Sequence, residues 1–344
     1  MNKNASVRSA GHIPNTGLQA LADVIHKYQR ILITSHAQGD GDSVGSSLAL
    51  ALGLLEQGKQ ANILLADFPD KYRFLDQDGL IEVVSAPISA EFSAQWELGI
   101  VLDATEPERL GEFGESFINA PFEKICLDHH LVEKRQEYLV HYSDPTSPST
   151  GSLVLSLLDC LQIPLSPPLA KALFVAIATD TGWFRYSNTT SDVFRDISRL
   201  MEAGASPDPL YHQIYEQLPF PRLTLQAKVL ERVKTAFEGA YLWSTLDMDT
   251  IRNSGVARTA FEGLIDPLRT VAGARIVSFF SETDKGVWKI SLRSRGRCDV
   301  EKIASRFGGG GHAKAAGCTV EGSLEEVENT VLKEVETELK VKPK

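Results

Sequence analysis

The sequence predicts an α/β protein with two domains: an N-terminal, mostly parallel sheet flanked by helices, and a smaller C-terminal α/β domain, with a cleft between them. Apolar runs of strand length alternate with stretches of helical periodicity through the first half of the chain, as in parallel α/β units. His and Asp residues follow three of these apolar runs directly. The length of 344 residues also suits two domains.

The elements of the first half follow from the spacing of apolar residues. A helix over 17–28 precedes a buried strand at 31–34, and the next helix runs over 43–57. We expect Ser43 to be the N-cap of this second helix and Gly58 to stop it. Further strands are expected at 62–66, 81–84, 98–102 and 124–127, and further helices at 151–161 and 167–179.

The second half begins where prolines interrupt a helical pattern, at positions 207, 209, 219 and 221. Beyond it we expect strands at 240–246, 275–281 and 286–292 and helices at 257–268, 299–307 and 323–339. We predict a loose leader over residues 1–16 and a catalytic metal-binding domain over 17–200. A helical linker over 201–230 and a substrate-binding domain over 231–344 follow. The Lys-rich end of the chain is expected to fray.

Composition excludes several classes of protein. No apolar run reaches the length of a membrane span, and the N-terminus lacks the apolar core of a signal peptide. The four cysteines form no C-x-x-C pair, so neither a zinc knuckle nor a disulfide framework is expected, and a reduced cytoplasmic setting fits. The formal net charge of −10 argues against tight binding of long nucleic acid, but not against a small phosphorylated substrate held by a few arginines.

Acidic and imidazole side chains stand at four successive element ends. Each alone is explained by a helix cap or a solvated turn, but together they predict one metal-binding cleft at the carboxyl edge of the sheet. Carboxylate and imidazole without thiolate suit Mn²⁺ or Mg²⁺, and two ions that share one Asp form the arrangement used for phosphoryl displacement. The candidates are His36, Asp40, Asp42, Asp103, Asp128, His129, His130 and Asp180.

Two further segments are candidates for binding substrate. A glycine run, Gly308 to Gly311, lets backbone N–H groups approach an anion, and we expect a helix N-terminus after it to favour negative charge. The alternative is a flexible turn. Aromatic residues follow Asp180, and Phe184 either stacks on a base or belongs to the core.

Four segments of the chain resemble the DHH phosphoesterase superfamily: His36 to Asp42, Asp103, Asp128 to His130, and Thr179 to Gly182. The tail resembles the associated DHHA1 domain through Arg293 to Arg295 and Gly308 to Ala313. The order of the motifs and the two-domain length are most similar to the nanoRNase/pAp phosphatase (NrnA) branch. One departure is Gly39, where the family commonly has Pro, and it puts the rigidity of this loop in question.

The resemblance implies a role for each site residue. His36, Asp40 and Asp103 would hold one Mn²⁺, and Asp42, Asp103, His129 and Asp180 would hold the second, with Asp103 bridging. Asp103, Asp128 and His130 would be catalytic, with Asp128 orienting an imidazole and His130 facing the scissile phosphate or the leaving oxygen. The substrate-binding residues would be Arg293, Ser294, Arg295, Gly309, Gly310, Gly311, His312 and Phe184.

The activity implied is hydrolysis of oligoribonucleotides of about two to five residues to mononucleotides, and of 3′-phosphoadenosine 5′-phosphate (pAp) to AMP. A hydroxide bridging the two Mn²⁺ ions would be the nucleophile, with Mg²⁺ or Co²⁺ as alternative metals. The main alternative is a stand-alone phosphodiesterase for c-di-AMP or pApA. A RecJ-like single-strand exonuclease and a non-catalytic nucleotide-binding module are further alternatives. We expect no membrane partner and a monomer or homodimer.

Overall fold

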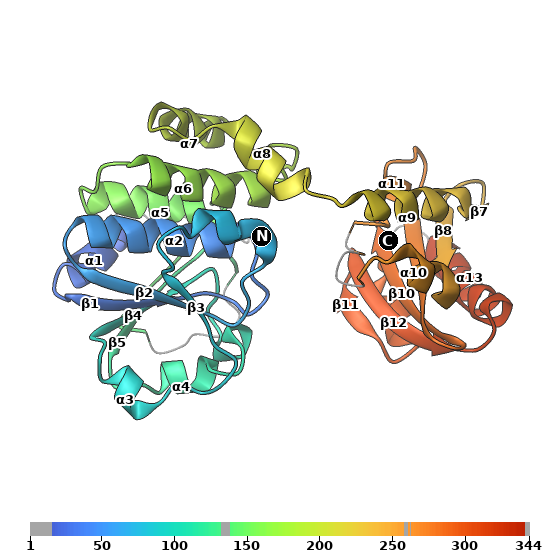
Figure 1. Ribbon diagram of the computed structural model, residues 1–344, viewed down its shortest axis with the longest axis horizontal. Helices are drawn as coiled ribbons and strands as arrows, with labels where there is room; N and C mark the ends of the chain where they lie inside the picture. The colour runs from blue at the N-terminus through green and yellow to red at the C-terminus, as the bar shows by residue number, and fades with distance from the viewer. Residues whose placement is uncertain (1–15, 132–137, 258–260, 262, 341–344) are drawn as a thin grey trace, which may run out of the picture. The chain divides into compact units, whose positions relative to one another are not determined.

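The computed structural model describes residues 16–131, 138–257, 261 and 263–340 (Figure 1). The chain divides into two compact units, residues 1–217 and 218–344. No helix within the described ranges is both long and apolar enough to cross a membrane. The predicted leader and the end of the Lys-rich tail lie outside the described residues.

The first unit is built on a six-stranded parallel sheet with the order β3-β2-β1-β4-β5-β6. Its central strands, β1 and β4, pair in parallel, and the direction in which strands are added reverses between them. In open α/β sheets such a switch point places a crevice beyond the carboxyl ends of the strands. The strands are β1 Arg30–Thr34, β2 Gln60–Leu65, β3 Ile81–Val83, β4 Leu98–Leu102, β5 Glu123–Asp128 and β6 Val140–Ser143.

Helices cover both faces of this sheet (Figure 1). One layer contains α1 Thr16–Ile25, α2 Gly41–Glu56, α5 Thr150–Cys160 and α6 Pro167–Asp180, and its apolar side chains form the larger core. The opposite face carries α3 Ala90–Ser93 and α4 Gly114–Ile118 over a smaller core. The remaining elements of the unit are η1 Asp70–Leu75, η2 Pro107–Leu110, α7 Ser191–Glu202 and α8 Pro207–Tyr215.

The α2 and α6 helices pack closely because glycines lie where they meet. A Cβ on Gly45 would lie 2.4 Å from the carbonyl oxygen of Ala172, and one on Gly41 would lie 2.3 Å from Oγ1 of Thr179. No real Cβ approaches a neighbour so closely, so both positions require glycine. This close approach brings the start of α2 beside the end of α6.

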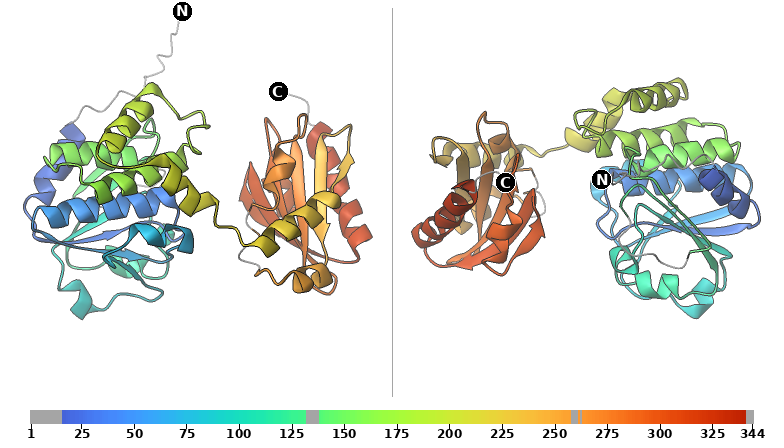
Figure 2. Two further views of the ribbon diagram at one scale, coloured as in Figure 1. Left: turned by 45° about the horizontal axis from the view of Figure 1, so that its top comes forward. Right: turned by 180° about the vertical axis from the view of Figure 1, so that it is seen from behind.

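The second unit is a mixed six-stranded sheet with the order β11-β12-β10-β9-β8-β7 and helices on both faces (Figure 2). Only β8 and β9 pair in parallel among its described strands. The strands are β7 Lys234–Ala236, β8 Tyr241–Leu246, β9 Ile276–Asp284, β10 Val287–Ser294, β11 Gly310–His312 and β12 Ala315–Glu321. The helices are α9 Phe220–Glu231, α10 Met248–Ser254, α11 Asp266–Arg269, α12 Glu301–Ser305 and α13 Leu324–Lys340.

The predicted fold class is confirmed, while several local predictions are wrong. Asp40, not Ser43, is the N-cap of α2: its carboxylate accepts from Ser43 N at 2.9 Å, and Ser43 Oγ accepts from Asp40 N at 2.9 Å. The helix expected over 257–268 is wrong, because the described residues of that range form an α-helix only from Asp266, where the short α11 begins; residues 258–260 and 262 lie outside the described set. β6 was not expected at all.

Candidate functional site

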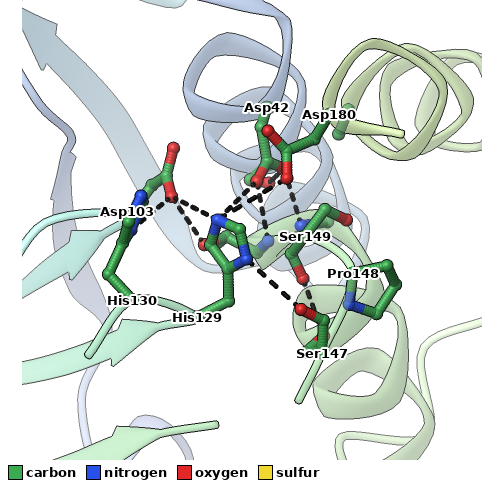
Figure 3. Close-up of polar contacts among 12 residues, drawn as sticks. Asp42, Asp103, His129, His130, Ser147, Pro148, Ser149 and Asp180 are labelled. Atoms are coloured by element: carbon green, nitrogen blue, oxygen red, sulfur yellow. Dashed lines mark hydrogen bonds and ion pairs between the residues drawn. The ribbon is translucent and has the colours of Figure 1, made fainter. Parts of the chain in front are cut away.

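The metal-ligand candidates meet at the carboxyl edge of the first sheet, where several elements end or begin (Figure 3). Strands β1, β4 and β5 end close to one another there, α2 begins beside them, and α6 ends with Asp180. Six side chains that the sequence singled out therefore converge from four separate parts of the chain. They are His36, Asp40, Asp42, Asp103, His129 and Asp180.

A first group surrounds His36. Its Nε2 lies 3.2 Å from Oδ2 of Asp103 and 3.7 Å from Oδ2 of Asp40. The backbone of Asp103 is left-handed, with φ of 59°, a region that Asp tolerates better than most residues. A strained backbone at the meeting point of ligands is typical of functional sites.

A second group surrounds His129. Its Nε2 lies 3.8 Å from Oδ2 of Asp42, 3.7 Å from Oδ2 of Asp180 and 3.5 Å from Oδ1 of Asp103. The two oxygens of Asp103 thus face the two histidines, Oδ2 toward His36 and Oδ1 toward His129. The two groups overlap at this one carboxylate.

The chemistry of His129 fits a divalent cation. Its Nδ1 lies 3.3 Å from the carbonyl oxygen of Ser147, and a proton donated there leaves a lone pair on Nε2 that faces three carboxylates. A lone pair and a carboxylate repel each other unless a cation lies between them. Two ligands each about 2.1 Å from one ion stand about 3.0–3.4 Å apart, close to the separations here.

The crowding of negative charges at the site also favours a bound cation. Asp42 is 1% exposed, and burial together with the charges of Asp103, Asp180 and Asp40 raises its pKa well above the usual value. Burial, reinforced by Asp103, raises the pKa of Asp180 to about 6, although His129 opposes the shift. Carboxylates crowded in this way hold protons unless a cation neutralises them.

The N-terminus of α5 supports the site from behind, a contribution that the sequence analysis missed. Thr150 N and Gly151 N donate to the two oxygens of Asp42 at 2.7 and 2.8 Å, and Thr150 Oγ1 donates to Asp103 Oδ1 at 2.9 Å. Helix N-termini stabilise carboxylates, so α5 holds both in fixed positions. The signal in the sequence was Ser149, which caps α5.

Asp128 and His130 form a pair beside the two groups. Asp128 Oδ1 accepts from His130 N at 3.0 Å and lies 2.8 Å from His130 Nδ1, while Thr105 Oγ1 donates to its other oxygen. Burial opposes ionisation of Asp128, but the hydrogen bonds from His130 prevail and hold its pKa at about 2. The hydrogen bond to Asp128 raises the pKa of His130 in turn.

Comparison with known proteins identifies the family. The "DHH family, N-terminal domain" model matches residues 30–177, and the "DHHA1 domain" model matches residues 239–341. The bifunctional oligoribonuclease and PAP phosphatase NrnA of Thermus thermophilus is 34% identical over 313 residues, which cover 90% of each protein. The chain belongs to the DHH–DHHA1 family. It is therefore an enzyme of the phosphodiesterase/phosphatase class.

Two further proteins are similar to this DHH–DHHA1 chain over most of its length. The crystal structure of an exopolyphosphatase-related protein from Bacteroides fragilis superposes with a TM-score of 0.83 at 26% identity, covering 94% of this chain and 96% of that one. The cyclic-di-AMP phosphodiesterase GdpP of Geobacillus thermodenitrificans is 26% identical over 308 residues. The match covers 85% of this chain but only 45% of that protein.

The glycine run of the DHHA1 domain forms a hairpin, so the helix expected after it is wrong. β11 pairs antiparallel with β12, with Gly311 opposite Ala316. A Cβ on Gly309 would lie 2.2 Å from the carbonyl oxygen of Gly317, and one on Gly311 would lie 2.5 Å from that of Ala315. Packing thus requires two of the glycines, whereas Gly310 and His312 are exposed.

The predicted arginine segment of the DHHA1 domain lies at the end of β10, next to this hairpin. Arg293 is opposite Ala315 of β12 and is half-buried, and Arg295 is exposed just beyond the strand. Ser294 is buried, and its hydroxyl lies 2.8 Å from the carbonyl oxygen of Cys298 and 2.9 Å from that of Ala313. Ser294 therefore ties together the loops on which the arginines and His312 stand.

Phe184 lies in the DHH domain, four residues after Asp180. It and Trp183 have left-handed backbones, with φ of 67° and 55°. The Phe184 ring packs edge-on against Phe174 of the core at 6.1 Å and tilts against the exposed Phe194 at 5.7 Å. The ring thus joins the core to an exposed aromatic side chain on α7.

Proposed function

We propose that this protein degrades very short oligoribonucleotides to mononucleotides and converts pAp to AMP. The observation that carries the proposal is the pair of His/Asp groups that overlap at Asp103 in a chain of the DHH–DHHA1 family. The similarity to the NrnA protein of Thermus thermophilus supports the choice of substrates.

Two Mn²⁺ ions are the cofactors that suit these residues. His36, Asp40 and Asp103 would hold the first, and Asp42, Asp103, His129 and Asp180 the second. Oxygen ligands with imidazole favour Mn²⁺, with Mg²⁺ and Co²⁺ as the alternatives. When bound, such ions lower the pKa of a bound water and neutralise charge on a phosphate.

His130 acts on the leaving oxygen. Asp128 accepts the hydrogen bond from Nδ1, which leaves Nε2 as the nitrogen that can donate to substrate. The raised pKa of His130 keeps the imidazole protonated at higher pH, as a general acid requires. The side chain of His130 is 44% exposed, so a substrate can reach it.

The DHHA1 domain holds the substrate through Arg293, Arg295 and His312. Arg293 and His312 both lie opposite Ala315 of β12, one on each neighbouring strand, and Arg295 follows just beyond β10, in a protein whose formal net charge is −10. Arginine pairs with phosphate in bidentate fashion, so a few such contacts bind a short substrate without a basic surface. The four cysteines are all free, which is compatible with the cytoplasm as the place of action.

The test is a matrix of metals against substrates with chromatography of the products. Mn²⁺, Mg²⁺ and Co²⁺ are each combined with a dinucleotide, pAp, a longer RNA and c-di-AMP. We expect mononucleotides from the dinucleotide and AMP from pAp, fastest with Mn²⁺, and little product from the longer RNA. Failure to cleave both the dinucleotide and pAp would refute the proposal.

A phosphodiesterase for c-di-AMP or pApA is the second candidate. It is favoured by the similarity to the GdpP protein, although this chain matches less than half of that protein's length. Cleavage of c-di-AMP at a rate above that of the dinucleotide in the same matrix would support it over the first candidate.

A further inference from the structure

A cavity of about 280 Å³ opens beside the metal-ligand candidates. It is lined by His36, Ala37, Gln38, Glu108 and Arg109. Since a water molecule in the liquid occupies about 30 Å³, the cavity has room for a phosphate group with its hydration. His36 contributes to both the cavity and the first ligand group, so the two are contiguous.

The backbone of Arg109 is held firmly against the loop that carries His36. Ala37 N donates to the carbonyl oxygen of Arg109 at 2.6 Å, and Arg109 N donates to that of Glu106 at 3.1 Å. Gly111 ends the η2 turn with φ of 89°, and a Cβ there would lie 2.7 Å from Cβ of Ala66. The chain is therefore shaped to bring this turn against the loop.

The side chain of Arg109, in contrast, engages no acidic group that the structure describes. Glu108 lines the same cavity, yet no ion pair joins it to the half-buried Arg109. The positive charge of Arg109 reaches His130, whose pKa it lowers against the stronger effect of Asp128. Arg109 thus lines the cavity without an acidic partner among the described residues, and its positive charge lies near enough to His130 to affect that side chain.

We propose that Arg109 binds the terminal phosphate of phosphomonoester substrates and so determines how well this enzyme acts as a phosphatase relative to a phosphodiesterase. The inference rests on the proposed function. A terminal phosphate carries three non-bridging oxygens and nearly two negative charges at neutral pH. A phosphodiester has two such oxygens and one charge. It therefore offers fewer hydrogen-bond acceptors and less negative charge to a bidentate guanidinium.

The experiment compares Arg109→Met and Arg109→Lys with Arg30→Met as the matched control. Arg30 pairs with Glu97 at the amino end of β1, the edge opposite the site. Arg109→Met removes a charged group that donates hydrogen bonds to the phosphate. It should lower kcat/KM roughly ten-fold or more for pAp, and only about two- to three-fold for a dinucleotide. Arg109→Lys should recover part of the loss, because lysine keeps the positive charge but not the bidentate geometry of the guanidinium.

Two readouts separate binding from a structural effect. Free guanidinium, at concentrations far below those that unfold proteins, should restore pAp hydrolysis by Arg109→Met but not by Asp103→Asn. Calorimetric titration of the Mn²⁺-treated protein with inorganic phosphate should show weaker binding to Arg109→Met and unchanged binding to Arg30→Met.

Equal losses for pAp and the dinucleotide, or no loss for either, would overturn the inference, as would unchanged binding of inorganic phosphate. These outcomes differ from a failure of the proposed function, in which the wild-type protein cleaves neither substrate. The phosphate titration then still decides the role of Arg109.

Discussion

Replacement of Asp103 by Asn should separate the stability of the metal-free protein from its response to metal. Asn has the size of Asp and tolerates the left-handed backbone that position 103 requires. Its amide oxygen can still accept from Thr150 Oγ1, and its amide nitrogen can donate to His36 Nε2. We expect the variant to fold and, since one of several crowded carboxylates is gone, to melt no lower than the wild type without metal.

The response to metal should be lost. An ion present at a hundred times its Kd stabilises the folded protein by about 2.7 kcal/mol. For a unit of 217 residues, this corresponds to a rise in Tm of roughly 5–10 °C for one site. Because Asp103 faces both ligand groups, Asp103→Asn should weaken both sites and show a rise of less than about 2 °C under the same conditions.

The assay is thermal unfolding of chelator-treated protein, first without metal and then with increasing Mn²⁺. Asp70→Asn is the matched control, because the Asp70 side chain is 96% exposed and belongs to neither ligand group. The control should respond as the wild type does. If Asp103→Asn gains as much stability from Mn²⁺ as the wild type, Asp103 is not a ligand and the reasoning fails.

Three further changes test individual parts of the structure. Thr150→Val removes the hydroxyl that donates to Asp103 but keeps the backbone amide that donates to Asp42. The affinity for Mn²⁺, measured by calorimetry, should therefore fall about ten-fold. An unchanged affinity would contradict a supporting role for Thr150. Gly45→Ala forces α2 away from the Ala172 carbonyl and should destabilise the protein by about 1–3 kcal/mol in denaturant unfolding; a neutral result would show that the helices can separate freely. Burial raises the pKa of Asp196 to about 6, so ionisation of this carboxyl destabilises the folded protein as the pH rises through that value. Asp196→Asn should therefore raise Tm at pH 7.5 and not near pH 4. The same change in Tm at both pH values would contradict this.

The sequence predicted that these candidate ligands lie together, because each of them stands at the end of a regular element. Apolar runs located the strands, and parallel strands bring their carboxyl ends to one edge, so His36, Asp103 and His129 could be placed together without coordinates. Asp180 could be added because the helical pattern ended on it. Ser149 could have located the start of α5, but its contact with the site could not be predicted, since Thr150 and its partner Asp42 are 108 residues apart and nothing local links them.

The wrong predictions arose where local signals were ambiguous. Asp40, Asp42 and Ser43 are all good N-caps, and tertiary contacts decide which residue takes that place. The segment after Gly311 is rich in Ala and looks helical, but pairing with β10 and β11 makes it a strand. In the α10 region, Gly255 ends the helix in a left-handed conformation after only seven residues, too few for a clear periodic pattern.

The most direct test of the two-metal centre is anomalous diffraction at the manganese edge from crystals grown with Mn²⁺. We expect two peaks about 3.5–4 Å apart, one among His36, Asp40 and Asp103 and the other among Asp42, His129 and Asp180, with Asp103 contacting both. A single peak, or peaks away from these residues, would contradict the assignment on which the proposed function rests.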